Sequence, residues 1–217
     1  LETAYAGRSW LWRDLHDNEL GKQIASPLLT AYSDPSINGY GHYKYDAEGT
    51  PAKRVTLIEN GILREFMNGR EYAAILDHSP NGSMRATESH AVPLVRMTNT
   101  VVAHGNKPPA EIVAEVKDGY FIVNHRIPSI SESRENFLIS AQKVYKIESG
   151  KITKLYRQGG ITADSKDFLM NIDAVGNDFF VFPIPDCGKG QPMQIMRVGN
   201  GGPTLRSKAK LTGRREL

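Results

Sequence analysis

The sequence has a single cysteine, Cys187, among its 217 residues, so it can form no intrachain disulfide. A chain without disulfides is typical of a reducing compartment, and we expect a cytoplasmic location. No apolar run approaches the roughly 20 residues that a membrane-spanning helix needs, and no signal-peptide pattern opens the chain. The first residue is Leu1 rather than methionine, which predicts that the chain is a fragment of a longer protein.

The sequence also lacks a large excess of either charge, because its 27 basic and 24 acidic residues give a net charge of only +3. The basic excess gathers in the last segment, "LRSKAKLTGRREL" at residues 205–217, which we interpret as a solvated tail. The sequence contains no basic helix stripe and no series of aromatic residues for base stacking. We therefore expect no direct nucleic-acid partner.

Complete catalytic motifs are missing as well. None of the six histidines has another histidine three to five residues away, so no HExxH pair for zinc is present. There is no GxSxG, and the glycines of "CGKGQ" and "GNGGPT" fit no nucleotide-binding pattern. We expect Asn200 to Gly202 to form a tight turn. Cys187 lies between prolines and glycines, which favours a loop, where a thiol is either a chance surface residue or a functional one.

Turn dipeptides separate short apolar runs along most of the chain. Asn60-Gly61 and Ser149-Gly150 each lie between two such runs and predict antiparallel hairpins. The polar stretch at residues 124–137 is interpreted as a solvated loop that could line a cleft. With no alternating strand-helix rhythm, the sequence favours an α+β fold, mainly antiparallel β, either barrel-like or one large curved sheet. Any division would cut a hairpin, so we expect one domain over residues 1–217.

Three or four short helices are expected among the strands. Residues 10–20 show apolar side chains at loosely helical spacing, and "REYAAILDH" at residues 70–78 is a second candidate. Pro108 and Pro109 open a third helix. Asp164 or Ser165 caps a fourth, which we expect to end at Gly176.

Several phrases of the sequence resemble the C-terminal half of the TldD/PmbA proteins, in order and over nearly the whole chain. They are "GKQIASPLL", "DAEGTPAKRVTLIENGIL", "DGYFIVNHRIPSISESRENF", "KVYKIESGKI" and "CGKGQPMQ…VGNGGPT". The match around Cys187 and "GGPT" is the most specific. Residues 124–137 depart from the glycine-rich version of the well-known bacterial members, so no peptide-contact residue is assigned there.

The resemblance implies a function that the residues alone do not show. The family, once named modulators of DNA gyrase, is regarded as zinc metallopeptidases that act on unfolded or leader-type peptides. Its D-type subunits hold zinc with two histidines of an HExxxH helix and one downstream cysteine, which implies that Cys187 is the third protein ligand. The HExxxH motif, with its catalytic glutamate, would lie upstream of Leu1. We therefore expect no catalytic residue and no tightly bound zinc in this chain alone.

Three functions remain open at the level of sequence. The first is the C-terminal domain of a zinc metallopeptidase, working as a homo-oligomer or with an E-type relative. The second is a non-catalytic scaffold or partner subunit, because E-type relatives lack the zinc ligands. The third, direct action on DNA gyrase, finds no support in a basic or aromatic surface pattern.

Overall fold

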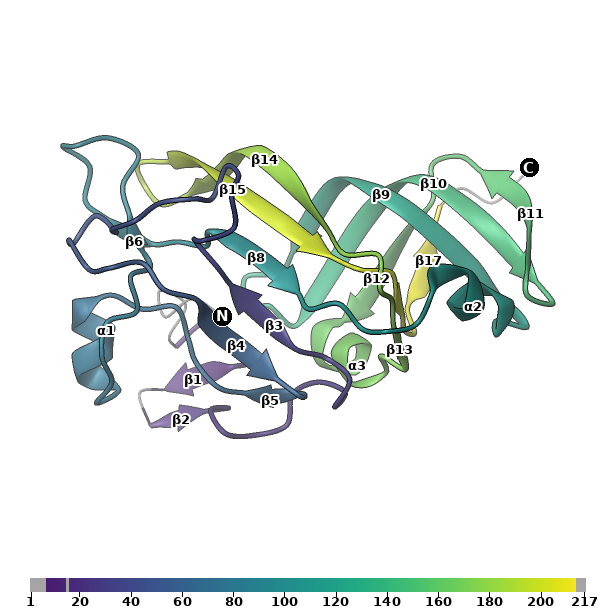
Figure 1. Cartoon of the computed structure of the whole chain (residues 1–217), viewed down its shortest axis with the longest axis horizontal. Helices are drawn as coiled ribbons and strands as arrows, with labels where there is room; N and C mark the ends of the chain where they lie inside the picture. The colour runs from purple at the N-terminus through teal and green to yellow at the C-terminus, as the bar shows by residue number, and fades with distance from the viewer. Residues whose placement is uncertain (1–6, 15, 214–217) are drawn as a thin grey trace.

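The computed structural model describes residues 7–14 and 16–213, which form two curved, open sheets that lie side by side along the long axis (Figure 1). The first sheet has the order β14-β15-β8-β3-β4-β5. Its strands are β14 (Phe180–Lys189), β15 (Gln194–Gly202), β8 (Asn99–Val102), β3 (Ala31–Ser33), β4 (Val55–Glu59) and β5 (Ile62–Leu63). All pairings are antiparallel except that of β15 with β8.

The second sheet has the order β11-β10-β12-β17, and β9 pairs along the other edge of β10. Its strands are β9 (Asp118–Ile130), β10 (Asn136–Glu148), β11 (Lys151–Tyr156), β12 (Gly160–Asp164) and β17 (Lys210–Thr212). Three short pairs complete the strands: β1 (Trp12–Asp14) with β2 (Asp17–Asn18), β6 (Met84–Arg85) with β7 (Leu94–Val95), and β13 (Ala174–Val175) with β16 (Leu205–Arg206).

Three short helices occur among the described residues: α1 (Arg70–Ile75), α2 (Pro109–Ala114) and α3 (Ser165–Met170). The side chain of Asp164 accepts a hydrogen bond from the backbone N–H of Asp167, which confirms the predicted cap. The mainly antiparallel α+β class is confirmed in its curved-sheet form. The helices are minor elements compared with the sheets, since each has only six residues.

Hairpin predictions made from turn dipeptides are confirmed. Asn60 and Gly61 have φ values of 50° and 82°, and Ser149 and Gly150 have values of 50° and 77°. Both pairs therefore have the left-handed backbone that type I′ turns require. They join β4 to β5 and β10 to β11, so local turn chemistry determines these two registers.

The helix expected at residues 10–20 is wrong, because the chain forms the β1–β2 hairpin there. Trp12 is 1% exposed, and its ring stacks on Phe66 at 5.1 Å and meets the edge of Tyr72 at 5.9 Å. Burying this large ring in the core outweighs a weak helical spacing. Leu15, part of that spacing, lies outside the described residues.

Three other expectations about chain geometry are also wrong. The loop at 124–137 is mostly strand, because β9 runs to Ile130 and β10 begins at Asn136. Helix α3 ends at Met170 rather than at Gly176, since residues 174–175 pair with β16. The basic segment from residue 205 contains β16 and β17, and Arg206 forms ion pairs with Asp173 and Glu115. Residues 214–217 of that segment lie outside the described residues.

Changing Gly61 to alanine is expected to lower the midpoint of urea unfolding substantially. A Cβ at this position would lie 2.3 Å from the carbonyl oxygen of Ala25, and φ is positive. Positive φ alone costs an L-residue about 1–2 kcal/mol. Gly49→Ala is the matched control, because Gly49 has a φ of 77° and a Cβ added there would meet nothing within 4 Å. Equal losses in the two variants would contradict the close backbone packing at Gly61.

Candidate functional site

Cys187 lies in strand β14 and not in the expected loop. β14 is an end strand of its sheet, and proline is tolerated at a sheet edge because one side of the backbone needs no ladder partner. This explains how Pro183 and Pro185 can precede the thiol within a strand. The turn follows later, around Gly190, where φ is 95°.

The register of β14 on β15 determines where the thiol points. Ile184 lies opposite Val198 and Cys187 lies opposite Met196, so β14 contains one extra residue, a β-bulge, between them. Directly paired residues share a face of the sheet. Cys187 therefore lies on the same face as Val198 and Met196, which are 0% and 6% exposed. The thiol itself is half-buried and free.

Two arginines surround this part of the hairpin. Arg96, only 1% exposed, donates from Nη2 to the carbonyl oxygen of Cys187 and from Nη1 to that of Gln194, at 2.5 and 3.0 Å. Burial lowers the pKa of Arg85, an effect opposed by Tyr43 and Cys187 and increased by the positive charge of Arg96. Cys187 thus lies in a partly dehydrated environment with two positive charges nearby.

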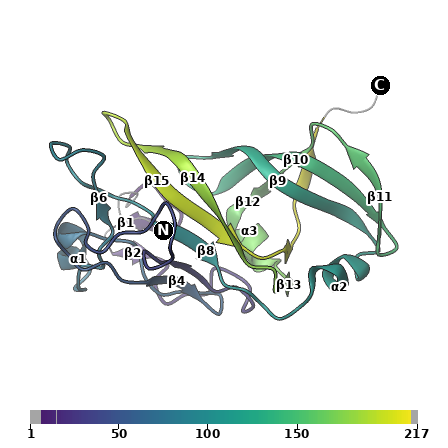
Figure 2. The same cartoon turned by 45° about the horizontal axis from the view of Figure 1, so that its top comes forward.

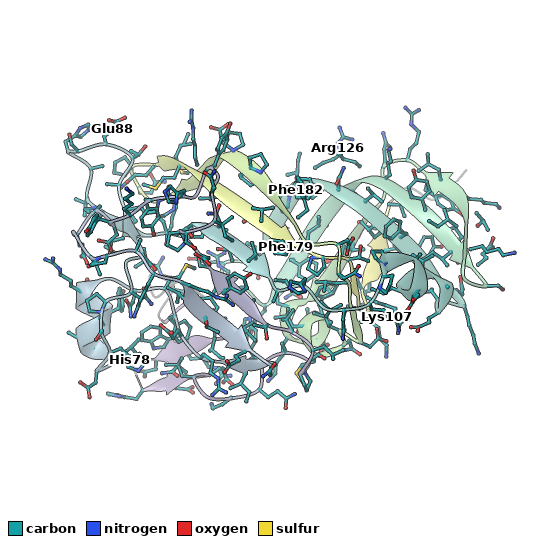
Figure 3. The ribbon with its side chains drawn as sticks, viewed as in Figure 1. His78, Glu88, Lys107, Arg126, Phe179 and Phe182 are labelled. Atoms are coloured by element: carbon teal, nitrogen blue, oxygen red, sulfur yellow. The ribbon has the colours of Figure 1, made fainter. Side chains whose placement is uncertain are left out.

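The described residues do not complete a metal centre. Within residues 7–14 and 16–213, no three His, Cys, Asp or Glu side chains gather at one place. Figure 3 shows how widely such side chains are spread, with His78 below α1 and Glu88 at the tip of the opposite loop. A catalytic zinc needs three protein ligands and one open position. Cys187 fits one of these positions chemically, and the described part of the chain offers no partner for it.

A cleft of about 700 Å³ lies between the two sheets, where β14 approaches β9. Figures 1 and 2 show the two strands next to each other from both directions, and Phe182 is labelled between the sheets in Figure 3. Phe180 and Phe182 line the cleft with 55% and 45% of their surface exposed, and their rings meet edge to face at 4.6 Å. They lie opposite Gly202 and Asn200, on the same face of β14 as Cys187.

Both strands beside the cleft are edge strands. Among the described residues, β14 pairs only with β15 and β9 only with β10. The outer side of each therefore presents backbone N–H and C=O groups that no described strand uses. Such an edge is a template for another extended chain.

The glycines of "VGNGGPT" permit close packing and do not form the tight turn expected at Asn200 to Gly202, because these residues continue strand β15. A Cβ on Gly199 would lie 2.3 Å from Oδ1 of Asn99, and one on Gly201 would lie 2.5 Å from the carbonyl oxygen of Phe180. Asn99 is 0% exposed, and its Nδ2 donates to the carbonyl oxygens of Asp34 and Ile37. Side chains at these glycines would push β15 away from both of its neighbours.

The end of this motif is fixed by Asp178 at the rim of the cleft. Its carboxylate accepts hydrogen bonds from the backbone N–H and the hydroxyl of Thr204, at 2.8 and 2.7 Å. Partial burial raises the pKa of Asp178, but the two bonds from Thr204 and a bond from the backbone N–H of Asp178 itself together outweigh it, so the pKa is lowered overall.

Comparison with known proteins places the chain in a family. The profile of the PmbA/TldA metallopeptidase C-terminal domain matches residues 1–213. A metalloprotease of Methanothermobacter thermautotrophicus is 33% identical over 197 residues, covering 91% of this chain and 42% of that protein. The zinc metalloprotease TldD homolog of Saccharolobus solfataricus is 34% identical over 169 residues, which are 78% of this chain and 37% of that protein.

A solved structure has the same fold. The crystal structure of TldE from Thermococcus kodakarensis superposes with a TM-score of 0.73 at 21% identity, over 90% of this chain and 42% of that one. The chain belongs to the PmbA/TldD family and corresponds to its metallopeptidase C-terminal domain. It spans less than half the length of the curated relatives described above. No helix among the described residues is long and apolar enough to cross a membrane.

The substitution Thr204→Val removes the hydroxyl that donates to Asp178. It is expected to raise the pKa of Asp178 toward its ordinary value of 3.8. Because the folded-state pKa is depressed, Asp178 contributes stability above its unfolded pKa, and this is lost as pH falls through the folded pKa. The stability difference between wild type and variant should therefore shrink in acid. Carboxyl carbon chemical shifts followed by NMR give the pKa directly.

Thr162→Val is the control for this titration, because the Thr162 hydroxyl donates to the carbonyl oxygen of Phe137 and to no carboxylate. An Asp178 titration that is the same in both variants would show that the Thr204 hydroxyl has no part in the shift.

Proposed function

We propose that this chain is the C-terminal part of a zinc-dependent metallopeptidase that hydrolyses unfolded or leader-type peptides. Membership of the PmbA/TldD family supports the reaction class, and one relative is named a zinc metalloprotease. The observation that carries the proposal is the position of the only thiol. Cys187 is half-buried on the edge strand β14, on the face that continues into the cleft.

In this proposal Cys187 is the third protein ligand of the metal. Two histidines and a glutamate of an HExxxH motif, implied by the resemblance and not contained in this chain, complete the centre. Bound zinc would polarise a substrate carbonyl and make a bound water acidic. The contribution of this chain is a sulfur ligand held on a β-strand, and a bulge beside it that directs the side chain.

The chain also contributes the surface that holds the peptide. An extended substrate that pairs with the outer edge of β14 gains backbone hydrogen bonds whatever its sequence. Every second side chain of such a peptide faces the same way as Phe180, Phe182 and Cys187. Binding through the backbone suits unfolded peptides, because a folded substrate has its own backbone groups already paired.

Assembly with an E-type relative, or with a second copy, is part of the same proposal. Phe180 and Phe182 leave much apolar surface open beside the cleft, and such surfaces mark interaction sites. A non-catalytic scaffold is the competing function, favoured by the lack of a three-ligand cluster among the described residues. The two functions differ in whether activity depends on Cys187.

In the full-length polypeptide, Cys187→Ala is expected to remove most bound zinc and most hydrolysis of an unfolded peptide. One of three ligands is lost, and no other cysteine of this chain can replace it. Zinc content by atomic emission and turnover of a fluorogenic peptide are the measurements. Met193→Ala, a change to an exposed sulfur side chain on the same hairpin, is the control. Unchanged zinc content and turnover in Cys187→Ala would support the scaffold function instead.

The 217-residue chain by itself is expected to show no peptidase activity and no tight zinc binding. A single thiolate ligand cannot hold the metal against water and buffer. Equilibrium dialysis against zinc, followed by the same peptide assay, tests this. A zinc-loaded, active preparation of the isolated chain would contradict the proposed ligand set.

A further inference from the structure

We propose that Arg96 is a positioning residue for the metal-binding thiol, holding the backbone of Cys187 at the β-bulge so that the side chain keeps one direction. The inference rests on the proposed function of Cys187. It assigns a role to a residue 91 positions away in the sequence, outside every motif that points to the site.

The contacts of Arg96 are unusual for a buried charge. The side chain is 1% exposed, and no described carboxylate forms an ion pair with it. Its guanidinium donates instead to two carbonyl oxygens, one on each strand of the hairpin, at Cys187 and Gln194. A buried charge is costly unless it is well hydrogen-bonded, so these two bonds tie the arginine and the hairpin to one relative position.

The β-bulge explains why an additional contact to the backbone is useful at this point. Between Ile184 and Cys187 the β14–β15 register shifts by one residue, and a bulge leaves its extra residue unpaired in the ladder. Pro185 in this interval has no N–H to donate. The backbone just before the thiol is therefore only partly fixed by β15, and Arg96 supplies a constraint from a third segment. Metal ligands commonly depend on such outer contacts for their orientation.

Neighbouring side chains hold the opposite strand in the same manner. Arg85 donates to the carbonyl oxygens of Met97 and Arg197, and Thr87 donates to that of Ile195. The segment that contains β6 and β7 thus contacts the β15 backbone on both sides of Met196, the residue paired with Cys187. In Figure 1 this segment lies against the end of the β14–β15 hairpin. On β14, Lys189 also donates to the carbonyl oxygen of Val95. Of these contacts, the bond from Arg96 is the one that reaches the backbone of Cys187 itself.

The decisive experiment is spectroscopic and uses the full-length polypeptide loaded with Co²⁺ in place of zinc. A thiolate bound to Co²⁺ gives a charge-transfer band that depends on the geometry of the sulfur–metal bond. In Arg96→Met we expect this band to weaken or shift and zinc affinity to fall about 10–100-fold. Arg96→Lys keeps the charge but cannot span both carbonyl oxygens, so an intermediate result is expected.

Two controls separate positioning from general destabilisation. Arg197→Met makes the same chemical change on β15, at an exposed side chain beside Tyr40. Val198→Ala weakens the packing of the hairpin without removing a hydrogen bond to Cys187. Both should keep the wild-type band. If the Arg96→Met variant fails to fold, the cobalt band and zinc affinity of the Arg96→Lys variant test the proposal. A wild-type band and wild-type zinc affinity in the folded Arg96 variants would overturn the proposal.

A metal-free measurement distinguishes this inference from the proposed function. Cys187 is the only thiol, so its alkylation by iodoacetamide in the 217-residue chain reports on one site. Arg96→Met should change the rate several-fold more than Val198→Ala does. If wild type shows no sulfur–cobalt band but the alkylation rate changes as expected, the ligand role fails and the positioning role stands. If the rate matches that of Val198→Ala, the positioning role fails, whatever Cys187 binds.

Discussion

The pairing of β14 with β15 is the constraint on which the candidate site depends. Its register places Cys187 opposite Met196 and the aromatic pair opposite Asn200 and Gly202, so thiol and cleft share one face. A slip of one residue would turn each of these side chains to the other face of the sheet. The bulge before Cys187 is what keeps the thiol on that face, because it adds one residue to β14 without changing β15.

The sequence predicts those parts of the fold that depend on neighbouring residues alone, such as tight turns and helix caps. Asn60-Gly61 and Ser149-Gly150 need a left-handed backbone, and Asp164 satisfies an unpaired N–H at the start of α3, so these features were predictable. The β1–β2 hairpin was not predictable in this way, since it depends on burial of Trp12 against Phe66, far along the chain. The strand around Cys187 was missed for a related reason. Proline and glycine indicate a loop unless the segment is known to lie at a sheet edge.

The residues of the candidate site differ in the same way, because some could be predicted from the sequence and others could not. Cys187 could be selected from the sequence because it is the only thiol and lies in a phrase with a family resemblance. Arg96 could not, because neither its spacing nor its neighbours set it apart from the other arginines. Only the folded chain shows that it is buried and bonded to two carbonyl oxygens of the hairpin. The cleft between β9 and β14 is likewise a product of tertiary packing, since its walls come from different sheets.

The thiol of Cys187 and the outer sheet edge lie on the same strand, β14. If a peptide pairs with β14, its register along the strand is set by backbone hydrogen bonds in steps of about 3.4 Å per residue. Under the proposed function, the metal ligand Cys187 is fixed to that same backbone. The distance between a given peptide carbonyl and the sulfur is then determined by register and not by side-chain recognition. Such a design would accept many sequences yet hold the scissile bond at one place, provided that the bulge at Cys187 stays rigid. In the positioning role proposed for Arg96, its hydrogen bond to the carbonyl oxygen of Cys187 supplies this rigidity.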